Sequence, residues 1–121
     1  MSQAPPPFTG PLPRIRGTQI GLDHPDTVDQ IKADMVAGRF AYHEPQARIG
    51  GYRDARGTYH VGGGHHRMVA ALEILAETGD ETPVRELLRW GLWADVPKAP
   101  AVSRPMPSRH WWGALRNRLG L

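Results

Sequence analysis

The chain has 121 residues, with 15 lysine and arginine residues against 12 acidic ones, which gives a formal net charge of +3. This length suits one domain with a core of its own and is too short for two. No stretch reaches the roughly 20 apolar residues of a membrane span, and no secretory signal opens the chain, so the sequence indicates a soluble protein with no membrane partner. The chain has no cysteine, which excludes disulfides, thiolate nucleophiles and cysteine zinc sites.

The excess positive charge lies in the last part of the chain. Residues 97–121 hold five basic residues and no acidic one, whereas the rest of the chain holds 10 basic and 12 acidic residues. Arginine interleaved with tryptophan suits contacts with phosphates and bases, and a solvated tail whose tryptophans cover the core is the alternative. We therefore expect a C-terminal extension over 97–121 that binds a nucleic-acid backbone through Arg104, Arg109, Arg116 and Arg118.

The first half of the chain predicts an arm, a strand and a helix. Residues 1–13 contain five prolines, which prevent a helix, and are predicted to be a linker or disordered arm. A domain over 14–96 then begins with a weakly alternating strand at 14–20. Thr27 and Gln30 form a capping box for an amphipathic helix that ends near Gly38.

A hairpin and a further helix follow. Strands over 48–52 and 58–61 are joined by a turn-rich loop at 54–57. The second strand runs directly into three glycines, and an apolar stripe then predicts a helix from about His65 that ends at Gly79.

The last predicted helix of the domain is capped by Thr82 and closed by Gly91. Regular order is expected to stop after Trp93: the proline-rich segment 97–107 should be extended, before Ser108 opens a short amphipathic helix. These elements predict a small α/β (α+β) domain, a mixed sheet with surrounding helices.

The run Gly62-Gly63-Gly64-His65-His66-Arg67 carries the main functional signal. Glycines let the backbone approach a ligand, and the amides that open a helix attract an anion, with the helix dipole behind them. Two imidazoles and a guanidinium beside them suit phosphate binding and acid–base chemistry. The run thus predicts a phosphate site made by Gly62, Gly63, Gly64 and Arg67, with His65, His66 and Arg67 as catalytic residues.

Structural roles compete with these functional ones. Adjacent side chains at a helix start point about 100° apart, so one of the two histidines is expected to turn inward. Both could instead cap or pack. Arg67 could pair with a carboxylate such as Glu73 or Asp54.

Weaker candidates surround the run. Since neighbouring residues of a strand point to opposite faces, only one of Tyr59 and His60 lines the site, and His60 is the more polar. Asp54 is most often a turn residue, and Glu73 is expected on a solvated helix face. The histidines match no zinc pattern. Asp54, Glu44 or Glu73 could bind Mg²⁺ or another divalent cation that assists the reaction, because magnesium needs few protein ligands.

Over residues 14–78 the chain resembles the ParB and sulfiredoxin superfamily. The similarity lies in a helix, an Ile-Gly-Gly-Tyr hairpin and the segment 63–67, where ParB proteins carry Gly-Glu-Arg-Arg, sulfiredoxins Gly-Gly-Cys-His-Arg and free-serine kinases Asp-Gly-His-Thr-Arg. The resemblance implies a nucleotide or phosphate site at this loop, covered by the segment that holds His43 and Glu44, and nuclease activity in some members. His65 replaces the sulfiredoxin cysteine, which excludes sulfinic acid repair through that residue.

The whole chain also resembles ParB-like toxin domains at the C-termini of bacterial polymorphic toxins of the Rhs type. This resemblance implies a secreted antibacterial effector module that lacks a signal peptide. It would be joined to a parent delivery protein through the N-terminal arm and would act as a nuclease on DNA in the cytoplasm of target bacteria, where a cognate immunity protein neutralises it. Two alternatives are a nucleotide-dependent phosphotransferase or NTPase at the same loop, and a nucleic-acid-binding module without catalysis.

Overall fold

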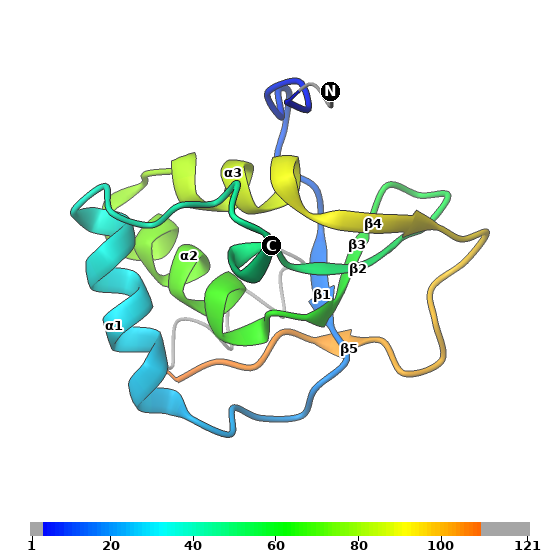
Figure 1. Cartoon of the computed structure of the whole chain (residues 1–121). Helices are drawn as coiled ribbons and strands as arrows, with labels where there is room; N and C mark the ends of the chain where they lie inside the picture. Colours follow the sequence, from blue (N-terminus) through cyan, green and yellow to red (C-terminus); the bar gives the residue numbers. More distant parts are fainter. Residues whose placement is uncertain (1–3, 110–121) are drawn as a thin grey trace.

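The computed structural model describes residues 4–109, which form a five-stranded mixed sheet with three α-helices on one side of it (Figure 1). None of the helices in this part of the chain is long and apolar enough to cross a membrane. The elements in chain order are β1 (Ile15–Gly17), α1 (Pro25–Val36), a 3₁₀ turn (Pro45–Ala47), β2 (Gly50–Arg53), β3 (Tyr59–Gly63), α2 (His65–Thr78), α3 (Thr82–Trp90), β4 (Leu92–Asp95) and β5 (Arg104–Pro105).

Strand β3 is the centre of the sheet, whose strand order is β4-β2-β3-β1-β5. It runs antiparallel to β2 and parallel to β1. The β2–β3 pairing confirms the predicted hairpin, and its loop is held by Asp54, whose Oδ1 accepts the backbone N–H groups of Arg56 and Thr58. The mixed α and β character predicted from the sequence is therefore present.

Strand β4 corrects the expectation that order stops after Trp93. Residues 92–95 pair in parallel with β2, because α3 returns the chain to the edge of the sheet where β2 has an open side. The proline-rich segment that follows is not extended throughout, contrary to the prediction: it bends at 97–98 and turns at 101–102, where the Ser103 N–H donates to the Pro100 carbonyl at 3.0 Å. It then contributes the two residues of β5, which pair antiparallel with β1.

The predicted capping box at Thr27 and Gln30 is wrong. Helix α1 begins at Pro25, and its N-cap residue is His24, three residues before Thr27, with no side-chain cap. The Thr27 N–H donates to the His24 carbonyl at 3.0 Å, and Pro25 has no N–H to satisfy, so the first turn needs no capping side chain. Thr82 likewise lies inside α3, whose N-cap residue is Glu81.

Helix α2 lies at the centre of the helical layer, and eight of its 14 residues are buried. Its apolar side packs with residues of β3, α1 and α3. The largest fully buried apolar side chains of this core are Val28, Val61, Met68, Val69, Val84, Leu87 and Met106. Because removing such side chains from water is the main favourable term in folding, this packing holds α2 against the sheet and its neighbouring helices.

The turn at Gly64 connects β3 to α2. Its φ of +96° lies in the left-handed region, and a Cβ atom there would lie 2.3 Å from Cγ2 of Ile49. A residue with a side chain would therefore be strained and would clash with the core. Glycine is required here for α2 to follow β3 directly.

Glu73 is buried, contrary to the solvated face expected for it. Its exposed fraction is 2%, and its carboxylate binds Lys32 of α1 at 3.1 Å and Arg109 at 2.6 and 2.8 Å. The side chain faces inward because α1 and the segment after β5 both cross α2 at this point. The carboxylate thus joins three parts of the chain that are distant in sequence.

The proline-rich arm contacts the domain over the part of it that the structure describes. Arg89 donates to the Pro5 carbonyl at 2.9 Å, Arg85 donates to that of Phe8 at 3.1 Å, and the Phe8 ring meets Tyr59 edge to face. These contacts place residues 5–8 against α3 and β3. A role as linker to a larger protein stays a prediction, and the helix predicted after Ser108 falls on residues outside the described range.

Replacing Gly64 with alanine should destabilise the fold by about 2 to 4 kcal/mol, from the left-handed φ and the contact with Ile49. Urea unfolding followed by circular dichroism measures the change. Gly63→Ala is the matched control, because Gly63 has no positive φ and a Cβ there meets nothing within 4 Å. Equal stability of the two variants would contradict this account of the turn.

Replacing Glu73 with glutamine should lower stability near neutral pH by about 3 kcal/mol, the low end of the cost of breaking a buried ion pair. Burial raises the pKa of Glu73, but the bonds from Arg109 and Lys32 outweigh it and hold the pKa below its usual value. The carboxylate therefore stabilises the fold above pH 4.5, the ordinary value, and this contribution is lost as the pH falls through the lowered folded-state pKa. Urea unfolding at several pH values should show the two proteins converging in acid, and a constant difference at all pH values would contradict the assignment.

Candidate functional site

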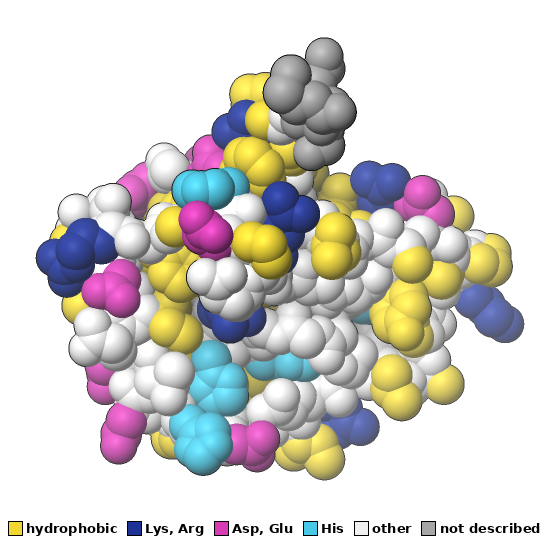
Figure 2. All heavy atoms as spheres, viewed as in Figure 1, with side chains coloured by type: hydrophobic (Ala, Val, Ile, Leu, Met, Phe, Trp, Pro, Cys, Tyr) yellow, Lys and Arg dark blue, Asp and Glu magenta, His cyan; other side chains and the backbone are white. Residues whose placement is uncertain are grey.

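A pocket of about 240 Å³ lies where α1 and α2 begin. Figure 2 shows histidine side chains gathered on this face of the molecule. Pockets that enclose whole drug-sized ligands measure roughly 300 to 1,000 Å³, so this one suits a phosphate group better than a complete nucleotide. The lining residues are His24, Thr27, Ile31, Gly64, His66 and Arg67.

His66 lines this pocket with its imidazole ring. Its Nε2 atom accepts the backbone N–H of His24 at 3.1 Å, and the two histidine rings stack at 6.3 Å between centroids. Since Nε2 accepts a hydrogen bond, the neutral ring carries its proton on Nδ1. The bond is exposed, so water or a ligand can displace the His24 N–H.

His65 is the histidine that turns inward. Its exposed fraction is 4%, and its Nε2 accepts the backbone N–H of Thr18 at 3.0 Å. Burial lowers the pKa of His65, the neighbouring His66 lowers it further, and a hydrogen bond with the Val61 backbone only partly opposes them. His65 is therefore a neutral residue that ties α2 to the chain after β1, and it does not line the pocket.

Arg67 lines the pocket and pairs with neither carboxylate considered for it. One of its terminal nitrogens, Nη2, donates to the Gln46 carbonyl at 2.8 Å. A guanidinium has five N–H donors in a planar fork, so this bond orients the group and leaves donors for an anion.

The glycine run divides between strand and turn. Gly62 and Gly63 were expected in the phosphate loop, but they are the last residues of β3, and Gly63 pairs with Gly50 of β2. Only Gly64 lines the pocket. The amides available to an anion are therefore those of the first turn of α2, which have no acceptors within the helix.

His43 and Glu44 do not line the pocket. His43 is exposed and Glu44 is half-buried, with 3.4 Å between His43 Nε2 and Glu44 Oε1, and the His43 ring packs against Trp90 at the end of α3. The same segment does reach the start of α2, but through the carbonyl of Gln46 rather than through these side chains. The 3₁₀ turn of this segment begins at Pro45. His43 and Glu44 lie before this turn and outside the pocket.

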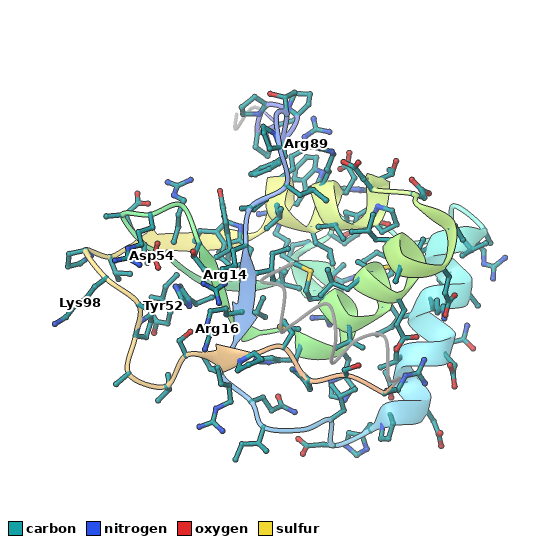
Figure 3. All side chains as sticks on the ribbon, turned by 180° about the vertical axis from the view of Figure 1, so that it is seen from behind. Arg14, Arg16, Tyr52, Asp54, Arg89 and Lys98 are labelled. Carbon is teal, nitrogen blue, oxygen red and sulfur yellow. The ribbon has the colours of Figure 1, made fainter. Side chains whose placement is uncertain are left out.

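His60 and Asp54 lie on the other side of the sheet. His60 is fully buried, and its Nε2 lies 2.8 Å from Asp54 Oδ2 while its Nδ1 lies 2.7 Å from Ser103 Oγ. These residues border a second hollow, beside β1 and the hairpin loop, that Figure 3 shows from behind with Arg14, Arg16 and Asp54 labelled. The structure therefore brings His60 and Asp54 together, but not with His66 and Arg67.

Of the arginines expected to bind a nucleic-acid backbone, the structure describes Arg104 and Arg109, and neither lines the pocket. Arg109 forms ion pairs with Glu73 and, at 3.0 Å, with Asp29, so its positive charge is balanced by acidic residues of the same chain. This corrects the expectation that Arg109 binds a nucleic-acid backbone. The Nε of Arg104 is buried without a hydrogen-bond partner among the described residues, and Arg116 and Arg118 lie outside them.

Within residues 4–109 no three histidine or acidic side chains gather in a way that could hold a metal ion. The oxygens of Asp54 and Glu73 are already bonded, to His60 and two amides and to Arg109 and Lys32 respectively, and Glu44 lies elsewhere. These three carboxylates thus do not form a shared divalent-cation site.

Comparison of the chain with protein-family models, curated proteins and solved structures finds no match. The site is therefore interpreted from its own geometry.

The sequence analysis did not identify His24 and Ser103 as residues of the candidate sites. His24 precedes a proline, a pattern typical of the start of a helix. This pattern does not reveal that His24 contacts His66, which lies 42 positions away. Ser103 lies in a proline-rich segment without a motif, 43 positions from His60. Only the packing of α1 on α2, and of the segment before β5 on the sheet, brings these pairs together.

His65 should stay neutral to lower pH than an ordinary histidine, because burial disfavours its charged form. NMR titration of the histidine ring signals measures this directly. Since the folded-state pKa is lowered, stability should fall as the pH drops below 6.5, the ordinary value, where the unfolded chain takes up the proton first. His65→Gln should reduce that pH dependence, whereas a His65 that titrates normally would contradict the assignment.

Proposed function

We propose that the chain is a ParB/sulfiredoxin-like domain that acts as an antibacterial toxin nuclease and cleaves phosphodiester bonds of DNA. The observation that carries the proposal is the pocket at the start of α2, which Gly64, His66 and Arg67 line beside the first turn of the helix. Its volume of about 240 Å³ is small for a whole nucleotide, which supports a phosphodiester as the ligand.

In this proposal the phosphate lies between the guanidinium of Arg67 and the amides that open α2. Both are donors to non-bridging oxygens, and the helix dipole adds a partial positive charge. The charge that develops on the phosphorus-bound oxygens during attack is stabilised by the same donors.

His66 moves the proton. Its Nε2 takes a proton from the attacking water once the exposed bond from the His24 N–H opens, as the water oxygen bonds to phosphorus and the ester P–O bond breaks. The exposed His24 ring, stacked on His66, is the second imidazole at the pocket and supplies a proton to the leaving oxygen.

The biological setting belongs to the same proposal. The proline-rich arm joins the domain to a delivery protein, an immunity protein neutralises it, and it acts in the cytoplasm of target bacteria. Arg104, Arg116 and Arg118 are the remaining candidates for contacts with the DNA backbone, since Arg109 is engaged with Glu73.

Purified protein should convert supercoiled plasmid to nicked or linear forms, assayed with and without Mg²⁺. His66→Ala should slow cleavage by about 10²-fold or more, the usual contribution of a general acid or base. Arg67→Gln should weaken binding and cleavage together because it removes a charged phosphate contact.

His43→Ala is the matched control, because this exposed histidine lies outside the pocket and should leave cleavage unchanged. Plasmid that stays intact under all conditions would reject the nuclease. Cleavage by His66→Ala at the unchanged rate would show that His66 is not a catalytic residue. Salt-sensitive DNA binding without turnover would instead indicate a binding module.

A further inference from the structure

The second hollow lies on the sheet face that the helices leave uncovered. It measures about 480 Å³ and is bordered by β1, the hairpin loop and the segment 97–103. Four cationic residues line it, together with a single carboxylate, Asp54, so the lining has a formal net charge of +3. Those cations are Arg14, Arg16, Arg56 and Lys98.

The positive charge of this hollow is not balanced within the part of the chain that the structure describes. None of the four cations makes an ion pair there. Asp54 is already engaged by His60 and by two backbone amides. Burial lowers the pKa of Arg16, and the like charge of Arg14 lowers it further. An anion in the hollow would relieve this repulsion.

A line of hydrogen bonds holds Arg16 in place. Because a carboxylate only accepts, His60 donates from Nε2 to Asp54 Oδ2, and its Nδ1 forms a hydrogen bond of 2.7 Å with Ser103 Oγ. Ser103 Oγ in turn accepts the Nε–H of Arg16 at 2.9 Å. The terminal nitrogens of Arg16 remain for a ligand. Figure 3 shows Arg14 and Arg16 together beside β1, with Lys98 on the loop beyond them.

Serine, histidine and aspartate in this order also form the triad of serine hydrolases. Two features indicate that Ser103 holds Arg16 in position rather than acting as a nucleophile. The His60 side chain is only 1% exposed and both of its ring nitrogens are already hydrogen-bonded, to Asp54 and to Ser103. Ser103 Oγ also already accepts a bond from a guanidinium, which reduces its tendency to attack.

We propose that this hollow binds a phosphate-bearing ligand through Arg16, with Arg14, Arg56 and Lys98 around it. Asp54, His60 and Ser103 are positioning residues that fix the Arg16 guanidinium. The volume lies within the range of pockets for small ligands and fits a nucleotide or one step of a nucleic-acid backbone. The site lies on the opposite side of the sheet from the α2 pocket, and its existence does not depend on the nuclease proposal.

NMR titration with inorganic pyrophosphate tests the site in the full chain. We expect the amide signals of Arg56, Thr58 and Ser103 to shift in a saturable manner, independently of any shift at Gly64. Thymidine 5′-monophosphate and a phosphodiester tetranucleotide then distinguish the two sources of phosphate. Equal affinities indicate a free nucleotide, and a tighter, more salt-sensitive tetranucleotide indicates a nucleic-acid backbone; both support the phosphate site.

Arg16→Gln and Ser103→Ala should each weaken pyrophosphate binding about tenfold or more, as expected when a hydrogen bond to a charged group is lost or misplaced. Ser103→Thr keeps the hydroxyl and should keep the affinity, which a purely structural role of Ser103 would not require. Arg39→Gln is the charge-matched control, because Arg39 lies at the exposed end of α1 and pairs with Asp34.

Absence of saturable shifts around Thr58 would overturn the proposal. So would an Arg16→Gln protein that folds and binds as well as the unchanged one. His66→Ala should leave binding at this hollow intact, so failure of the nuclease assay and failure of this site are separate results. Reaction of Ser103 with a fluorophosphonate would also overturn the supporting role, since it would show a nucleophile.

Discussion

The backbone turn at Gly64 joins the central strand of the sheet to the central helix, and the arrangement of the polar sites follows from it. A left-handed φ and the proximity of Ile49 leave no room for a side chain at this point. The chain can therefore pass from β3 into α2 without a loop. As a result the first turn of α2, with His66 and Arg67, lies directly at the end of β3, and the unpaired amides of that turn border the pocket.

The alternation of side chains along β3 separates the two candidate sites. Tyr59 and Val61 face the helices and are buried in the core, whereas His60 between them faces the other side of the sheet. On that side the segment before β5 covers it and brings Ser103 and Lys98 to the hollow that Arg14, Arg16 and Arg56 line from β1 and the hairpin loop. One short strand thus supports a pocket at its end and a basic hollow on its far face.

Charges in this protein divide between those used to hold the fold and those left for ligands. Glu73 binds Lys32 and Arg109 and so fastens α1 and the C-terminal segment to α2. An arginine that composition assigns to nucleic-acid binding thereby serves the structure. Arg67, by contrast, uses one nitrogen to bond a carbonyl, and Arg16 uses one to bond a hydroxyl. Neither guanidinium is neutralised by these bonds, which suits an anionic ligand.

Patterns local in sequence determined the hairpin around Asp54, the start of α2 after the glycines, and the ends of α2 and α3 at Gly79 and Gly91. Each depends on a few neighbouring residues, through turn chemistry and helical periodicity. Tertiary structure alone decided that residues 92–95 become a strand, that His65 turns inward while His66 does not, and that His24 and Ser103 join the sites. These outcomes depend on contacts between residues some 40 positions apart, which backbone propensity does not encode because they form only when α1, α2 and the sheet pack together.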